Sequence, residues 1–203
     1  VAGIVRPGMT VLDVGCGNGY STLLFAEALP SSEIIGVDYS SVMVRHANDA
    51  LAQSNLGSRV RFAEADVLCL ESQQSEFGEF DVIVSERCII NLKNWNEQRT
   101  AILQMRSLLK ENGTLVLVEN TQEGLASLNN VRKLLGLHEI SIRWHNFYIP
   151  QSDMERWLPN YFKTESIENI VNLYYLVSRV VDGKLTQFEG REPDYNQPIN
   201  KNA

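Results

Sequence analysis

The sequence predicts an α/β fold built on a doubly wound, mostly parallel sheet of seven strands. Short apolar runs alternate with amphipathic stretches of helical length as far as Glu119, and the first run leads straight into a glycine-rich turn. Strands that alternate with helices of roughly 10–15 residues are typical of βαβ units and a parallel sheet. Two apolar runs near the carboxyl end lie too close together for a crossover helix, so we expect them to form an antiparallel pair.

The predicted parallel strands are short apolar runs, each followed by a polar or glycine-rich turn. The first, TVLDV, ends directly at glycines, and EIIGVD, EFDVIVS and TLVLVE follow the same pattern. The five strands span residues 10–14, 33–38, 59–65, 79–85 and 114–119.

The predicted helices between these strands carry apolar residues at helical spacing. Pro30 ends the first helix, Ser40 or Ser41 is the N-cap of the second, and Asn112-Gly113 ends the third. The three helices span residues 18–29, 40–51 and 96–110.

The alternation of strands and helices stops after residue 119. We predict a helix over 121–137, a short helix over 154–158, and the antiparallel pair over 165–171 and 173–181. These elements complete one domain over residues 1–189, followed by an extended polar tail over 190–203. Because the chain starts at Val1 and a strand follows almost at once, we expect that native N-terminal residues are missing.

Bulk properties narrow the class of protein. The chain has 203 residues, enough for one α/β domain with a substantial core. Its formal net charge of −7 disfavours binding to nucleic-acid phosphates or anionic lipids. Three cysteines without CxxC spacing argue against a disulfide framework and a zinc site. With neither a membrane-length apolar run nor a signal peptide in the sequence, we expect a cytoplasmic protein without metal, nucleic-acid or membrane partners.

The glycine-rich turn is the strongest indication of a ligand. Its sequence, VLDVGCGNG, connects the first strand to the first helix, and glycine there lets the backbone turn tightly and approach a ligand. The NAD fingerprint GxGxxG would need a glycine where Tyr20 stands. The carboxylate of Asp13 would repel a pyrophosphate but attract a ligand with ammonium and sulfonium cations, such as S-adenosylmethionine (SAM).

Acidic residues follow the second and third strands. Asp38 is placed to accept hydrogen bonds from ribose hydroxyls. Asp66 could accept the amino group of an adenine, with Val67 stacked on the ring; the alternative is a plain Asx turn.

Together these segments resemble the first three motifs of class I SAM-dependent methyltransferases: VLDVGCGNG, GVDYS and EADV occur in the family's order and spacing. FDVIVS, a helix and ENGTLVLVE resemble the rest of that core, so the resemblance covers roughly residues 5–119. It implies a Rossmann-like fold with SAM as the cofactor. The cofactor-binding residues that it implies are Asp13, Gly15, Cys16, Gly17, Asn18, Gly19, Asp38, Tyr39, Ser40, Met43, Asp66, Val67, Ser85 and Glu86.

The acceptor should contact segments that follow the fourth and fifth strands, because ligands of open α/β sheets lie beyond the carboxyl ends of the strands. The first segment, SERCIINL, offers Arg87 and Asn91; Arg87 could hold an acidic acceptor or simply pair with Glu86. It lacks the (N/D)PP(Y/F/W) sequence of many family members that methylate nucleic-acid amines, which disfavours base methylation.

The second segment, RWHNFY, combines aromatic residues with a histidine. Aromatic faces stack on sugars, so we predict that Trp144, Asn146 and Tyr148 bind the acceptor. His145 is the candidate general base because histidine titrates near neutral pH. The alternative is a surface loop pinned by a buried Trp144, with His145 capping it.

SERCIINL, ENTQEGL, WHNFY and EPDYNQPIN are also similar to bacterial methyltransferases associated with surface polysaccharides or small metabolites. This similarity favours O-methylation of a sugar or another small hydroxylated acceptor. Glu86 and Glu119 keep N-methylation of a small amine or amino-sugar open, and a non-catalytic SAM-binding module is a third alternative. Tyr20 and Asp13 argue against a nicotinamide-dependent oxidoreductase.

Overall fold

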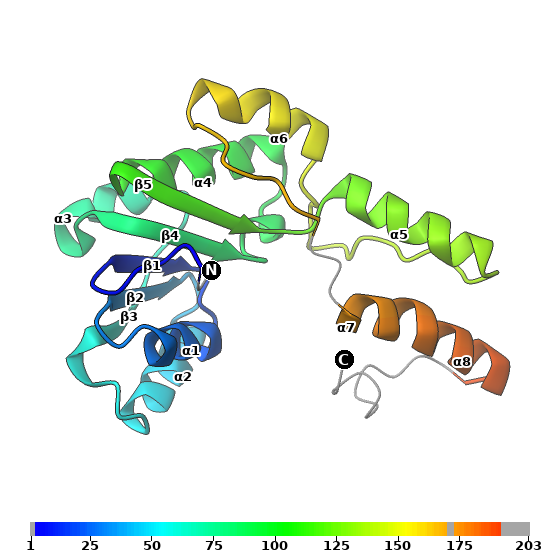
Figure 1. The fold of residues 1–203 in the computed structure, drawn as a ribbon, viewed down its shortest axis with the longest axis horizontal. Coiled ribbons are helices and arrows are strands. Elements are labelled where there is room, and N and C mark those ends of the chain that lie inside the picture. Colours follow the sequence, from blue (N-terminus) through cyan, green and yellow to red (C-terminus); the bar gives the residue numbers. More distant parts are fainter. Residues whose placement is uncertain (1–2, 170–172, 192–203) are drawn as a thin grey trace. The chain divides into compact units, whose positions relative to one another are not determined.

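The computed structural model describes residues 3–169 and 173–191, and only the backbone of residues 173 and 174. A parallel five-stranded sheet dominates the first part of the chain (Figure 1). The strands are β1 (Thr10–Val14), β2 (Glu33–Asp38), β3 (Val60–Glu64), β4 (Phe80–Glu86) and β5 (Leu109–Val118). The connecting helices are α1 (Tyr20–Ala28), α2 (Ser41–Ala52), the short α3 (Gln74–Phe77) and α4 (Trp95–Ser107).

The strand order is β3-β2-β1-β4-β5, and every pair in it is parallel. The chain first winds from β1 outward to β3 and then returns to place β4 on the other side of β1. This reversal between β1 and β4 is a topological switch point, where ligands of open α/β sheets bind. The Rossmann-like α/β fold with a parallel sheet is therefore confirmed.

Both faces of the sheet are buried, as a parallel sheet requires. On one face, Val11 and Ile34 belong to the same buried cluster as Ala26 of α1 and Ala47 of α2. Leu12, the next residue of β1, is also fully buried, as are Ile102 and Met105 of α4. Because successive strand residues point to opposite faces, the alternation of Val11 and Leu12 separates these two halves of the core.

The described chain divides into two compact units, one of residues 1–119 with 144–147 and the other of residues 120–143 with 148–203. The second unit contains α5 (Gln122–Leu134), α6 (Gln151–Trp157), α7 (Leu173–Leu176) and α8 (Asp182–Glu189). A π-helical turn over Val177–Val181 joins α7 to α8. The single domain expected over residues 1–189 stays a prediction.

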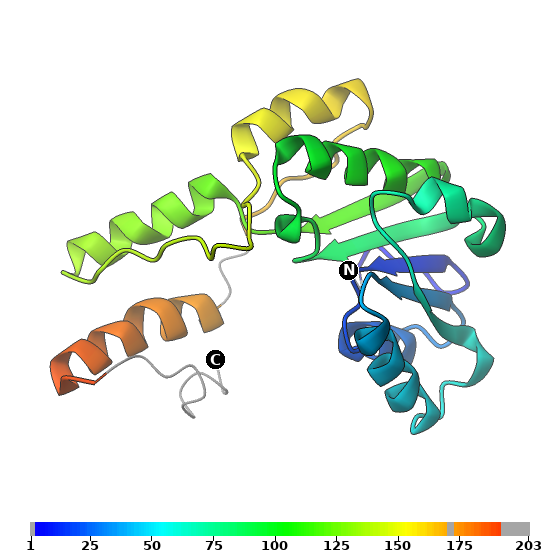
Figure 2. The ribbon, with the colours of Figure 1, turned by 180° about the vertical axis from the view of Figure 1, so that it is seen from behind.

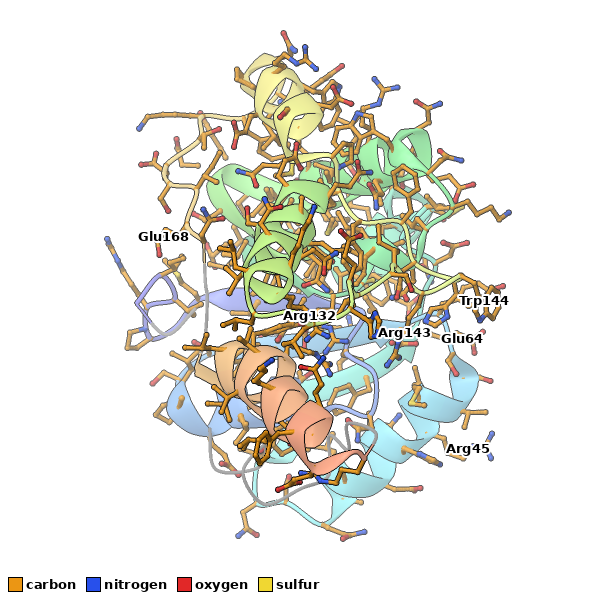
Figure 3. All side chains as sticks on the ribbon, turned by 90° about the vertical axis from the view of Figure 1, so that its right-hand side faces the viewer. Arg45, Glu64, Arg132, Arg143, Trp144 and Glu168 are labelled. Atoms are coloured by element: carbon orange, nitrogen blue, oxygen red, sulfur yellow. The ribbon has the colours of Figure 1, made fainter. Side chains whose placement is uncertain are left out.

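Helix α5 lies beside α8 in the second unit (Figures 1 and 2). Between them Arg132 is buried, and its guanidinium donates to the carbonyl oxygens of His138 and Arg179 (Figure 3). On the other helix, Lys184 donates to the Leu135 carbonyl at 2.8 Å. The carbonyl of Leu135, directly after α5, thus receives a charged donor from α8, which stabilises the end of a helix.

The predicted antiparallel pair is not found in this unit. Residues 173–181 are helical, residues 165–169 form no strand, and residues 170–172 lie outside the described residues. The valines of this segment favour a strand, but Ser178, Asp182 and Thr186 recur every four residues and form the buried face of a helix. Residues four apart share one face in a helix and in a strand, so this spacing is compatible with both, and tertiary packing overrides the β propensity of the valines here.

The described part of the chain ends at Arg191. Gly190 follows α8 with a left-handed φ of 68° and ends the helix. Of the predicted tail over 190–203, residues 192–203 lie outside the described residues. Within the described part of the chain, no helix is long and apolar enough to cross a membrane.

Candidate functional site

The glycine loop stands at the carboxyl end of β1, at the switch point of the sheet. Gly15, Gly17 and Gly19 all have positive φ, at 80°, 55° and 80°, a conformation that other residues rarely adopt. A Cβ atom at Gly15 would lie 2.5 Å from the Cβ and Sγ atoms of Cys88, so the turn after β4 packs directly on the loop. A Cβ atom at Gly17 would meet nothing within 4 Å, so the loop has an open side there.

Asp13 lies under this loop, and the sequence-based interpretation of its role needs refinement. Its side chain is buried, and Oδ2 accepts a hydrogen bond from Thr22 Oγ1 of α1 at 2.5 Å. Burial raises the pKa of Asp13 to about 6, an effect opposed by Thr22 and reinforced by the charges of Glu86 and Asp38. Asp13 therefore ties β1 to α1, and direct attraction of a cationic ligand stays a prediction.

Asp38, at the end of β2, holds the other side of the loop. Its Oδ2 accepts from the Gly17 amide at 2.9 Å, and its Oδ1 accepts from the Ser40 amide at 2.8 Å. Ser40 in turn is the N-cap of α2 and accepts from the Met43 amide. One carboxylate thus fixes both the glycine loop and the start of α2, beside the open side at Gly17. Each carboxylate oxygen keeps further acceptor capacity for a ligand hydroxyl.

The remaining predicted cofactor residues lie around this edge. Tyr39 and Met43 are exposed, with 76% and 40% of their surfaces accessible. Asp66 Oδ1 accepts from the Leu68 amide at 2.9 Å, which makes the Asx turn, and Val67 is half-buried. Asn18 accepts from the Tyr20 amide at the start of α1. The adenine roles of Asp66 and Val67 stay predictions.

The turn after β4 carries the predicted acceptor residues. Arg87 is exposed and has a left-handed φ of 52°, and its amide donates to the Val118 carbonyl of β5. Glu86 is also exposed, while Ser85 is fully buried. Asn91 donates through Nδ2 to the carbonyls of Arg87 and Cys88, which closes the turn. The side chains of Glu86 and Arg87 are thus exposed, while hydrogen bonds from Asn91 and to β5 fix the backbone of the turn.

Two polar residues hold this turn: Glu119, which the sequence suggested only as a carboxylate near the acceptor, and the buried Gln98, which the sequence did not indicate. Glu119 follows β5 and accepts through Oε1 from Ser85 Oγ at 3.2 Å and from the Cys88 and Ile89 amides at 3.0 and 3.1 Å. Gln98 of α4 donates through Nε2 to the Ile89 carbonyl at 3.1 Å. The position of Glu119 at a strand's carboxyl end indicated its place near the acceptor, but not these hydrogen-bond partners. No sequence signal identifies the partners of Gln98.

The two predicted acceptor segments meet in the structure. Phe147 donates its amide to the Ile90 carbonyl at 2.7 Å, and Asn146 Nδ2 donates to Asn91 Oδ1 at 2.9 Å. Gln98 Nε2 also donates to the Phe147 carbonyl at 2.6 Å. Residues 144–147 are therefore fastened to the turn after β4.

The aromatic residues of that segment differ in their settings. Trp144 is 95% exposed and lies at the periphery of the molecule (Figure 3), so the alternative of a loop pinned by a buried tryptophan is wrong. The exposed ring of His145 stands edge-on to Trp144, with their centroids 5.2 Å apart. Tyr148 is half-buried in the second unit, where its carbonyl accepts from Gln122.

Comparison with known proteins identifies the family. The family model described as "Methyltransferase domain" matches residues 6–163. The chain belongs to this methyltransferase family. A protein described as the uncharacterized protein RP028 of Rickettsia prowazekii is 29% identical over 167 residues, which is 81% of this chain and 62% of that protein.

Two further likenesses agree with the methyltransferase family. The ubiquinone/menaquinone biosynthesis C-methyltransferase UbiE of Ectopseudomonas mendocina is 30% identical over 121 residues, 59% of this chain and 45% of the relative. The crystal structure of YcgJ from Bacillus subtilis superposes with a TM-score of 0.57 at 23% identity, covering 76% of this chain and 62% of that one, and shows the shared fold. The chain spans less than two thirds of these two curated relatives' lengths.

The residues of this methyltransferase chain fit SAM, the cofactor of class I members. The open side at Gly17 leaves room for a ligand against the loop backbone, and Asp38 stands beside it. Residues 10–40 contain no Lys or Arg that could neutralise a pyrophosphate, whereas carboxylates follow β1, β2 and β5. Such an edge suits a cofactor that carries cations. Among the described residues no group of three His, Cys, Asp or Glu side chains could hold a metal ion.

Proposed function

We propose that the protein transfers a methyl group from SAM to a hydroxyl of a small molecule or of a sugar or polysaccharide precursor. The observation that carries this proposal is the glycine loop, closed by Asp38 and open at Gly17, at the switch point of a methyltransferase-family sheet. When bound, SAM supplies a methyl group activated by its sulfonium, so the protein mainly has to bind, orient and exclude water.

The acceptor side rests on the link between residues 144–147 and the turn after β4. Asn146 and Asn91 are held together, which places Arg87, Asn91, Asn146 and the aromatic Trp144 in one part of the first unit. Amide, guanidinium and aromatic groups are those that bind sugars and hydroxylated rings. His145 is exposed beside Trp144 and is the base that we propose for the hydroxyl proton.

A second candidate function is N-methylation of a small amine or amino-sugar. Carboxylates gather at the carboxyl ends of the strands, and Glu119 has one oxygen that accepts no hydrogen bond from the described residues. An ammonium group would suit such surroundings.

The expected sheet of seven strands also stays a proposal. Among the described residues β5 has no neighbour on its outer edge, and most of its side chains are only half-buried. Sheets usually cover a long apolar edge. Strands beyond β5 would have to come from residues other than 173–181, which are helical, and 165–169, which form no strand.

The experiment that tests the function combines the protein, methyl-labelled SAM and a fractionated bacterial extract. Label in the glycan or small-metabolite fraction supports the proposal and narrows the acceptor. Label in protein or nucleic acid would replace the acceptor but keep the activity. Tighter binding of NAD than of S-adenosylhomocysteine (SAH), measured by titration calorimetry, would contradict the whole proposal.

A further inference from the structure

The two oxygens of the Glu119 carboxylate have different surroundings. Oε1 accepts three hydrogen bonds, from the hydroxyl of Ser85 and the amides of Cys88 and Ile89. Oε2 is shielded from solvent and has no hydrogen-bond partner among the described residues. Oε1 therefore serves the fold, since it fixes the turn after β4, whereas Oε2 contributes nothing to that turn.

A buried oxygen without a partner is unfavourable, and more so when it is charged. Burial raises the pKa of Glu119 to about 7, against the lowering effect of the three hydrogen bonds to Oε1. Near neutral pH the carboxyl group therefore either holds a proton, which belongs on Oε2 because Oε1 is occupied, or presents an unpaired anionic oxygen. Either state favours a ligand that brings a hydrogen-bond donor.

The position of this oxygen relates it to the cofactor loop. The side chain of Cys88, whose amide donates to Glu119, packs against Gly15 of the loop. Burial, then the charges of Glu119, Asp38 and Asp13, raise the pKa of the Cys88 thiol to about 12. Carboxylates from β1, β2 and β5 thus surround one thiol at the switch point. Among these three carboxylates, Glu119 is the one with an oxygen that is both shielded from solvent and without a hydrogen bond from the described residues.

We propose that Oε2 of Glu119 accepts a hydrogen bond from the O–H or N–H group that receives the methyl group. This inference rests on the proposed function and deepens it, because it assigns to Glu119 the binding of the O–H or N–H group that is methylated. Glu119 binds and orients that group. The uncharged face of the acceptor contacts the aromatic side chain of Trp144 in this proposal.

The test needs no knowledge of the acceptor. Sinefungin carries an amine where SAM carries its methyl group, so it places N–H donors at the position of methyl transfer, whereas SAH has no donor there. The dissociation constants of sinefungin and SAH are measured by calorimetry at pH 8 for the wild type, Glu119→Gln and Glu111→Gln. Glu111 is the matched control, an exposed glutamate on the same strand.

We expect Glu119→Gln to weaken sinefungin binding roughly 10- to 100-fold relative to SAH, the usual effect of losing a buried charge-assisted hydrogen bond. Glu111→Gln should leave the ratio of the two constants unchanged. An unchanged ratio in Glu119→Gln would overturn the inference and leave the proposed function intact. A wild type that binds neither compound would overturn both.

The wild type provides a second readout if Glu119→Gln does not fold. Its preference for sinefungin over SAH should fall as pH drops from 8 through 7, because protonation removes the charge of Glu119. The other ionisable groups at this end of the sheet include Asp13, Cys16, Asp38, Glu86, Arg87 and Cys88, with Asp66 after β3 and His145 in the segment fastened to the turn after β4. Asp13, with a pKa of about 6, titrates nearest, so the step must persist in Asp13→Asn. A flat ratio, or a step that Asp13→Asn abolishes, would overturn the inference.

Discussion

Asp38 holds the glycine loop with one carboxylate oxygen and the start of α2 with the other. Replacing it with alanine removes these anchors together with the proposed acceptor for the ribose hydroxyls. We expect Asp38→Ala to weaken SAH binding by roughly 1.5–3 kcal/mol. Calorimetric titration measures this, with Asp49→Ala, an exposed aspartate on α2, as the control. Equal affinities for SAH would mean that the ribose site lies elsewhere.

His145 gives a prediction of a different kind, because it contacts no part of the glycine loop in the described structure. If it is the base for a hydroxyl acceptor, His145→Ala should reduce kcat roughly 10²- to 10⁴-fold and leave SAH affinity unchanged. The exposed His46 of α2 supplies the control, His46→Ala. Full turnover by His145→Ala, once the acceptor is known, would return His145 to a purely structural role.

At the scale of single residues, the sequence was informative where the local structure depends on one continuous segment of the chain. Gly15, Gly17, Gly19 and Asp38 could be predicted because the loop and the strand end that hold them are continuous segments. The partners of Glu119 and Gln98 could not be predicted. Each depends on the register between distant strands or on where a helix docks, and a single sequence does not encode these legibly.

At the scale of elements, the starts of some helices were predictable, because an N-cap residue and the amide that it accepts from are only a few residues apart in the sequence. Ser40 caps α2 as expected, and Thr121 caps α5 by accepting from the Gly124 amide. The helix over residues 173–189 was missed because valine-rich sequence favours a strand in isolation. Its buried residues include the small polar Ser178, Asp182 and Thr186 beside Val180, so the apolar periodicity that usually reveals a helix is weak there.

One element-scale prediction concerns the junction of α5 and α6. Glu123 accepts hydrogen bonds from the amides of Gln151 and Ser152 at 2.9 and 3.0 Å and from the Ser152 hydroxyl at 2.9 Å, so it caps the start of α6. Partial burial acts to raise its pKa, but these hydrogen bonds lower it to about 2. We expect Glu123→Gln to reduce the free energy of unfolding by about 1 kcal/mol in a urea titration.

The pH dependence of this effect has a definite sign. The folded pKa of Glu123 lies below its unfolded value, so its contribution is present above about pH 4.5 and is lost as pH falls toward 2. The difference between wild type and Glu123→Gln should therefore shrink on acidification. Glu139→Gln, an exposed control in the same unit, should match the wild type throughout. A Glu123→Gln variant as stable as the wild type at pH 7 would show that the cap contributes nothing.

For the whole molecule, the sequence predicted the parallel α/β architecture because alternation of strand and helix leaves few other topologies. It did not predict two compact units, since contacts between distant segments decide how a chain divides. The seven-strand count rested on two segments after residue 164, and in the described part of these no strand forms.

The stability of the whole molecule should fall as pH rises through neutrality. The pKa values of Asp13 and Glu119 are raised by burial to about 6 and about 7. From about pH 4 to 7 the folded protein therefore keeps protons that the unfolded chain has lost, so raising the pH destabilises the fold. Each carboxyl contributes at most about 3 kcal/mol.

Urea unfolding at pH 5, 6, 7 and 8, without added ligand, measures this decline. Asp13→Asn and Glu119→Gln should each flatten it, because an amide does not titrate in this range. A wild type whose free energy of unfolding is constant over these four pH values would show that neither carboxyl is destabilised by burial as described.

Arg87 occupies a backbone conformation that suits glycine, directly after β4. A left-handed φ at a residue with a side chain costs on the order of 1 kcal/mol, and glycine at this position would avoid that cost. The chain therefore keeps an exposed cation in a strained backbone conformation, in the turn whose Cys88 packs on the glycine loop. If Arg87 binds the acceptor, as we propose, this strain is a cost of function. Stabilising the protein by design should leave this position unchanged.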